Sequence, residues 1–127
     1  MYTTQDAAQM FIGRGEVEAN IKMLEAQYYK REEEMPNDIK KLIDDYERKL
    51  LEIDGMLSLF SANEAFVIRH HLIEGLDWEQ VSLKYIALWG AASEKTIRSF
   101  QLWQTKALKK AADVLNNKTN TFSGAQQ

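Results

Sequence analysis

Residues 61–115, which decide the fold, read SANEAFVIRHHLIEGLDWEQVSLKYIALWGAASEKTIRSFQLWQTKALKKAADVL. Two glycines, Gly75 and Gly90, divide this stretch into three segments with the apolar spacing of helices. Asp77 comes just before the second segment and Gln80 follows three residues later, a spacing that predicts a capping box at the start of a helix. The order helix, turn, capped helix, turn and long helix is typical of a helix-turn-helix module.

The last predicted helix, which begins at a capping Ser93, has an apolar side and a basic side. At about 100° per residue, the apolar side contains Ile97, Phe100, Trp103, Gln104, Ala107, Leu108, Ala111, Val114 and Leu115. The middle of the opposite side contains Lys95, Arg98, Leu102, Lys106 and Lys109. Lysines on one side of a helix are usually there only for solubility. Here they occur on the last helix of a helix-turn-helix pattern, which favours binding to DNA.

The charge is distributed unevenly along the chain. The net charge of −3 over 127 residues argues, taken alone, against a nucleic-acid partner. Residues 1–60, however, carry eight Lys and Arg against thirteen Asp and Glu, whereas residues 61–127 carry eight against six. Within residues 93–118 the count is six against two, a net +4. The positive charge therefore gathers on the helix predicted to meet phosphates.

Three segments carry a resemblance to a known family: NEAFVIRHHLIEGLDWEQVSLKY from residue 63, SEKTIRS from residue 93 and KALKKAADVL from residue 106. They resemble region 4 of bacterial sigma factors, and in particular the phage late-gene activators of the RinA and ArpU type, which carry such a module behind N-terminal helices. The matching residues are Ile73 to Trp78, Glu79 to Val81, Ser93 to Arg98, and Ala107 to Lys110. The resemblance implies a phage- or prophage-encoded transcriptional activator that binds specific sequences of double-stranded DNA.

The candidate DNA-binding residues lie on the helix that starts at Ser93. We expect Arg98 to contact a guanine, Glu94 a cytosine and Leu102 a thymine methyl in the major groove. Lysines further along the helix are expected to contact phosphates and so to position the protein. The full set is Ser93, Glu94, Lys95, Arg98, Ser99, Leu102, Lys106, Lys109 and Lys110.

One segment departs from the family pattern. The family usually has about ten residues between the aromatic residue after the first turn and the serine before the last helix, whereas Trp78 and Ser93 are fifteen apart here. The surplus lies in residues 82–92. Either the second helix continues to about Trp89 or the second turn is longer, and both would change how the last helix docks on DNA.

The N-terminal half predicts a helical hairpin. Residues 4–12 form a short helix that ends at glycines, and Pro36 then separates two helices of about twenty residues each. The second of these has an unbroken spacing of four and three, as in a coiled coil. Its apolar seam consists of Ile39, Ile43, Tyr46, Leu50, Ile53, Leu57 and Phe60. The spacing leaves open whether the helix that covers this seam belongs to the same chain or to another.

The sequence therefore predicts an all-α protein in three parts. Residues 1–60 are the hairpin, which serves for assembly or for contact with RNA polymerase; residues 61–115 are the helix-turn-helix module; and residues 116–127 are a disordered tail. The partners considered are double-stranded DNA, RNA polymerase and a second copy of the chain bound through the N-terminal helices. We also expect a fragment of residues 61–127 to fold without the hairpin.

The sequence predicts no enzyme, no cofactor and no metal site. His70 and His71 are adjacent, so on a helix they point about 100° apart and cannot share a metal as an i, i+4 pair does. The serines have no nucleophile signature and the carboxylates are most simply solvated. The absence of cysteine, of a long apolar run and of a signal-peptide pattern predicts a protein of the bacterial cytoplasm without a membrane partner.

Two other functions fit the same pattern. One is the DNA-recognition subunit of a phage packaging machine, which also combines a helix-turn-helix with oligomerising helices, although in that class the DNA module more often comes first. The other is a helical module that sits on RNA polymerase without touching DNA. A footprint upstream of a promoter would favour the transcription regulator, and a ring-shaped oligomer would favour the packaging subunit. Retention by polymerase without DNA would favour the polymerase-binding module.

Overall fold

A computed structural model describes residues 1–125, with side chains as far as Asn117. As predicted, the protein is all-α, and the described chain contains no strand. Its elements are α1 (Thr4–Ile12), α2 (Arg14–Gln27), η1 (Glu32–Glu34), α3 (Asn37–Leu57), α4 (Ala62–Val67), the π-helical turn η2 (Ile68–Ile73), α5 (Trp78–Trp89), η3 (Ala91–Ser93) and α6 (Ile97–Ala125). Within the described residues, no helix is both long and apolar enough to cross a membrane.

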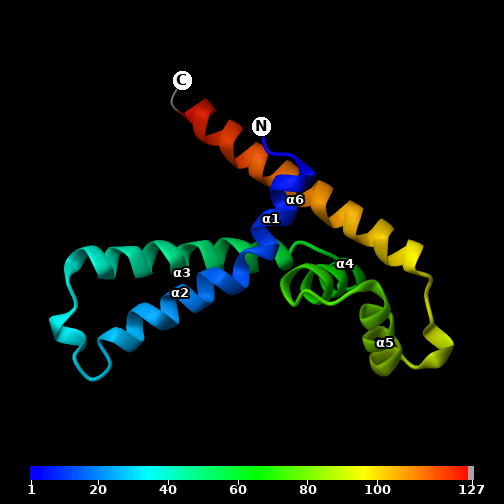
Figure 1. Cartoon of the computed structure of the whole chain (residues 1–127). Coiled ribbons are helices and arrows are strands. Elements are labelled where there is room, and N and C mark those ends of the chain that lie inside the picture. Colours follow the sequence, from blue (N-terminus) through cyan, green and yellow to red (C-terminus); the bar gives the residue numbers. More distant parts are fainter. Residues whose placement is uncertain (126–127) are drawn as a thin grey trace.

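Helices α2 and α3 form an arm that projects from the rest of the molecule (Figure 1). The predicted seam is covered from within the chain: on the helix that packs against α2, Ile43 is buried and Ile39, Tyr46 and Leu50 are half-buried, whereas Ile53 and Leu57 are buried in the core shared with α1 and α6. At the base of the arm, Arg14 Nε donates to Asp54 Oδ1 over 2.9 Å. The helix that covers the seam is therefore in the same chain, so these residues need no second copy to bury them.

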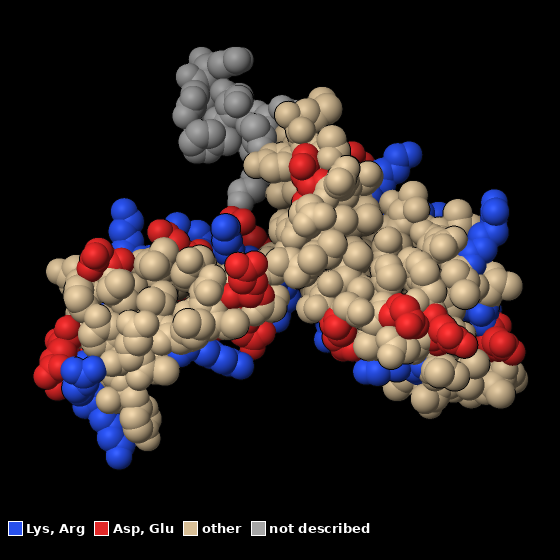
Figure 2. Space-filling model, viewed as in Figure 1, with Lys and Arg blue, Asp and Glu red and all other residues tan. Residues whose placement is uncertain are grey.

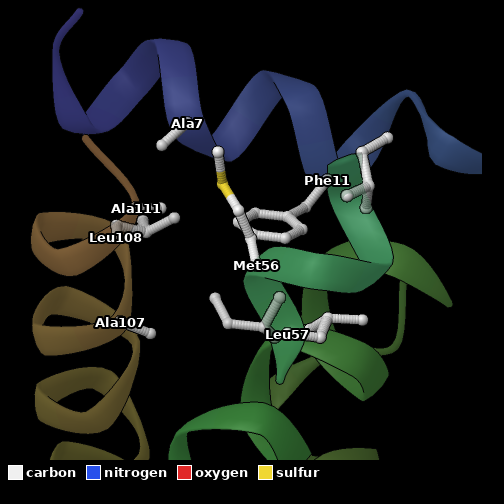
Figure 3. Packing of buried hydrophobic residues seen from close by; sticks show 9 residues of the cluster. Ala7, Phe11, Met56, Leu57, Ala107, Leu108 and Ala111 are labelled. Atoms are coloured by element: carbon white, nitrogen blue, oxygen red, sulfur yellow. The ribbon is translucent and has the colours of Figure 1, made fainter. Parts of the chain in front are cut away.

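The main core lies where α1 crosses α6 and the end of α3. Figure 3 shows Ala7 and Phe11 of α1 facing Met56 and Leu57 of α3 and Ala107, Leu108 and Ala111 of α6. Ala7, Phe11 and Ala107 are completely buried. Alanines on facing helices allow the two backbones to approach closely, which explains why a helix as short as α1 holds its place.

This core corrects the expected division of the chain at residue 60. Buried residues from both sides of that boundary, Phe11 and Met56 on one side and Ile68 and Leu108 on the other, belong to one cluster. Only the arm projects as an N-terminal unit, whereas α1 is part of the C-terminal body. A fragment of residues 61–127 would expose the face of α6 that α1 covers, which argues against the expectation that this fragment folds alone.

The tail also differs from the expectation. Residues 116–127 were expected to be disordered, but α6 continues from Ile97 to Ala125. Asn116 has a structural role, because its Oδ1 accepts from Tyr2 N over 2.7 Å and its Nδ2 donates to Tyr2 O over 3.0 Å. These two bonds join the N-terminus to α6. Residues 126–127 lie outside the described residues.

Replacing the buried aromatic residue of α1 tests whether α1 belongs to the core. Phe11→Ala is expected to lower the free energy of unfolding by about 3–5 kcal/mol, because a completely buried phenyl ring leaves a cavity. The adjacent Ile12 is 47% exposed, so Ile12→Ala serves as the matched control and should change stability by much less. Urea unfolding followed by circular dichroism measures both. Equal losses in the two variants would contradict this placement of α1.

Candidate nucleic-acid interface

An aromatic cluster fixes the first half of α6 against α4 and α5. Phe100 of α6 is completely buried and its ring centre lies 5.5 Å from that of Tyr85 in α5. Phe66 meets Tyr85 edge-on, with ring centres 5.3 Å apart. Edge-to-face contacts of this kind favour one relative orientation of the rings and so help to set the positions of the helices that carry them. The three helices α4, α5 and α6 therefore pack around one cluster, in the order that the sequence predicts.

The turn before α5 is built as the sequence predicts. Asp77 Oδ1 accepts from Gln80 N over 2.8 Å and Gln80 Oε1 accepts from Asp77 N over 3.0 Å, which confirms the capping box. Gly75 has a φ of +77°, a conformation that L side chains rarely adopt. His71 stacks on Trp78 with ring centres 3.7 Å apart, and its Nδ1 lies 2.8 Å from Leu76 O. These contacts hold the first turn in one shape.

The two histidines serve this turn. His70 Nδ1 lies 3.0 Å from Glu74 Oε2, and Lys84 of α5 reaches the same oxygen over 3.3 Å. The imidazole of His70, together with Lys84, holds the pKa of Glu74 below its ordinary value. Groups of three or more His, Cys, Asp or Glu suited to a metal ion are absent from the part of the chain that the structure describes.

The start of the last helix differs from the prediction. Ser93 was expected to cap it, but Ser93 closes the short turn η3, and its hydroxyl donates to Trp89 O over 3.0 Å. Helix α6 begins at Ile97, and Thr96 Oγ1 accepts from Ser99 N over 3.2 Å, the bond expected of a capping residue. The candidate residues Ser93, Glu94 and Lys95 therefore precede the helix.

The sequence left open whether the second helix continues to about Trp89 or the second turn is longer, and the structure decides between them. Helix α5 runs on to Trp89, so most of the surplus in residues 82–92 lengthens the helix. The chain then turns at Gly90, which has a φ of +89°, and passes through η3. Leu88 and Trp89 are 64% and 57% exposed at this end of α5.

The apolar side of α6 is largely as predicted. Phe100, Ala107, Leu108 and Ala111 are buried, and Trp103, Gln104, Val114 and Leu115 are half-buried. Ile97 is the exception, because it is 45% exposed. As the first residue of the helix it lies beyond the aromatic cluster, which begins at Phe100.

The opposite side of α6 is open to solvent. Arg98, Leu102, Lys106 and Lys109 are all exposed, and none of the three basic residues forms an ion pair within residues 1–117. Lys and Arg side chains line the edge of the molecule that α6 forms, with Asp and Glu gathered lower on the same face (Figure 2). We call the exposed stretch from Arg98 to Lys109 the outer face of α6.

Two predicted contact residues have other partners. Lys110 Nζ lies 2.7 Å from Glu64 Oε1, and Glu64 is only 5% exposed, so this lysine neutralises a buried carboxylate. Ser99 is half-buried, and its hydroxyl lies 3.1 Å from Thr96 Oγ1. These contacts give Lys110 and Ser99 partners within the chain, which Arg98, Lys106 and Lys109 lack among residues 1–117.

The outer face of α6 also includes two exposed residues that were not among those predicted from the sequence. Gln101 and Thr105 are exposed on the outer face, one and two turns after Arg98. The helical spacing i, i+3, i+7 from Arg98 could have identified both. Both are polar and uncharged, so neither the charge pattern nor the apolar pattern of the sequence marks them.

Comparisons with protein-family models, with curated proteins and with solved structures return no match for this chain.

The buried pair predicts a specific pH dependence. Burial of Glu64 would by itself raise its pKa, but Lys110 and the N–H and hydroxyl of Ser61 outweigh burial and hold the pKa of this carboxyl below its ordinary value of 4.5. A depressed pKa in the folded state stabilises the fold above pH 4.5, and this stabilisation is lost as the pH falls through the folded pKa.

Glu64→Gln should therefore lower the free energy of unfolding at pH 7 by about 1–3 kcal/mol, and the difference from wild type should shrink below pH 4.5. Urea unfolding across this pH range measures the difference. Glu47→Gln removes an exposed carboxylate from α3 and is the control, for which a near-zero and pH-independent effect is expected. A Glu64→Gln deficit that stays constant with pH would contradict the ion-pair assignment.

Proposed function

We propose that this protein is a transcription regulator that binds specific sequences of double-stranded DNA with the outer face of α6 in the major groove. The single observation that carries the proposal is the outer face itself. It is an exposed helical surface whose basic side chains form no ion pair within residues 1–117, and it lies on the helix that follows α4 and α5. The resemblance to sigma region 4 and to phage late-gene activators supports the same conclusion.

The length of the outer face suits this role. Arg98 and Leu102 are separated by one helical turn, about 6 Å, which fits within a major groove about 12 Å wide. Lys106 and Lys109 lie about 12–16 Å beyond Arg98, where the helix would pass over the phosphates at the edge of the groove. In this arrangement the start of α6 reads bases and its middle contacts the backbone.

We propose a different role for the arm. Residues 1–60, which include it, carry a net charge of −5, so this part of the chain repels the phosphate backbone on average. Its seam is already filled within the chain, which leaves its outer surface for another protein. RNA polymerase is the partner that a transcription regulator of this kind requires, and a second copy of the chain is the alternative. The proposal as a whole is tested by crosslinking the protein to DNA in cells, mapping the bound DNA across the genome, and asking whether RNA polymerase is recovered with it.

The role of Arg98 is testable on a site selected from random duplexes. Arg98→Ala should weaken binding to that site by about 1–3 kcal/mol and relax the preference at one base pair, because a guanidinium forked onto guanine discriminates against the other bases. Fluorescence anisotropy with the selected and a scrambled duplex measures both effects. Arg48→Ala, on the arm, is the control. Wild-type affinity of Arg98→Ala for both duplexes would exclude this helix as the reader.

Lys109 and Lys110 are adjacent in the sequence but are assigned different roles, so each serves as the control for the other. Lys109→Ala should weaken binding to every duplex alike and lower the slope of log affinity against log salt by about one unit, because one phosphate contact is lost. Lys110→Ala should instead lower stability, because Glu64 would remain buried without its partner. Affinity measured at several salt concentrations, with urea unfolding of both variants, separates the two roles. A loss confined to the selected duplex in Lys109→Ala would contradict its assignment to the backbone.

A further inference from the structure

We infer that Gln101 reads an adenine in the base pair next to the one contacted by Arg98, so that the preferred site contains a G·C pair followed by an A·T pair. This inference rests on the proposed function and specifies which bases the outer face of α6 recognises.

The position of Gln101 supports this inference. Its side chain is exposed and has no hydrogen-bond partner within residues 1–117. It follows Arg98 by three residues, so the two side chains are neighbours on one side of the helix, with Cβ atoms about 5–6 Å apart. Three residues advance the helix by about 4.5 Å, close to the spacing of about 3.4 Å between successive bases on one strand. Two side chains so placed in the major groove face neighbouring base pairs.

The chemistry of the amide selects the base. In the major groove adenine presents the N7 acceptor beside the N6 donor, and a glutamine amide matches this pair with one N–H and one carbonyl oxygen. Guanine presents two acceptors in the same places, so the carbonyl oxygen of the amide would face another acceptor. Gln101 thus favours adenine where Arg98 favours guanine.

The neighbouring side chains favour the same pair. Leu102 is 51% exposed on the outer face and can contact the C5-methyl group of thymine, the partner of adenine. Thr105 does not compete with Gln101 for the base, because its hydroxyl donates to the backbone oxygen of Gln101 over 3.0 Å. Adenine on one strand and thymine on the other are therefore recognised by consecutive residues of α6.

The test uses the full chain and its selected duplex with single-atom changes in the bases. Replacing the adenine by 7-deazaadenine removes N7, and replacing the paired thymine by uracil removes the methyl group. We expect 7-deazaadenine to weaken wild-type binding about tenfold and to leave Gln101→Ala unaffected, because that variant has already lost the contact. Gln101→Glu should shift the selected base from adenine to cytosine, since a carboxylate accepts from cytosine N4.

Gln5→Ala, which removes an exposed glutamine from α1, is the matched control and should select the wild-type site. If Gln101→Ala selects the same site with the same sensitivity to 7-deazaadenine, the inference is wrong and the proposed function stands. If the full chain selects no duplex sequence at all, the proposed function fails and the inference fails with it. Circular dichroism of each variant checks that the exposed substitutions leave the helix intact.

Discussion

Helix α6 packs against two separate groups of elements, the aromatic cluster of α4 and α5 and the core formed by α1 and the end of α3, and this double contact constrains the rest of the molecule. Its first half is fixed by Phe100 in the aromatic cluster with α4 and α5. Its middle is fixed by Ala107 and Ala111 against α1 and the end of α3. Both contacts use the apolar side of one continuous helix. The outer face from Arg98 to Lys109 is consequently presented to solvent on a helix whose apolar side is packed at two places.

The same core connects the two ends of the molecule. The arm is continuous with the core through Ile53, Met56 and Leu57, and Arg14 joins its base to Asp54. A protein bound to the arm would therefore be held at a defined position relative to DNA bound at α6. The continuous core therefore supports the proposal that the chain brings a protein partner to a DNA site. Two domains that moved independently would hold the partner at a less defined position.

Local patterns in the sequence predicted the elements well. The helix of residues 4–12, the capping box at Asp77 and the heptad seam were predicted because each depends on residues close together in the chain. The errors have a different origin. Ser93 and Thr96 are both good caps, and the structure shows which one the helix uses: Thr96 accepts from Ser99 N, whereas the hydroxyl of Ser93 donates to Trp89 O. Lys110 looks like any other exposed lysine until Glu64, 46 residues away, is placed beside it.

The packing of α1 on α6 was beyond local reasoning for a similar reason. The apolar pattern of a nine-residue helix gives no sign of its partner, and the residues that receive it come from α3, η2 and α6, which are far from α1 in the sequence. The same holds for Asn116, which a polar tail composition assigned to disorder but which binds the backbone of Tyr2. Contacts between distant segments decided where the units of this protein begin and end.

The most direct test of the central claim is to map the residues that contact DNA in the intact chain. Amide signals of the isotope-labelled protein would be followed by nuclear magnetic resonance while a duplex selected from a random library is added. We expect saturable shifts in residues 94–109, with the arm between residues 22 and 49 unaffected. Shifts confined to the arm, or none at any concentration of duplex, would contradict the assignment of the outer face of α6 as the DNA reader.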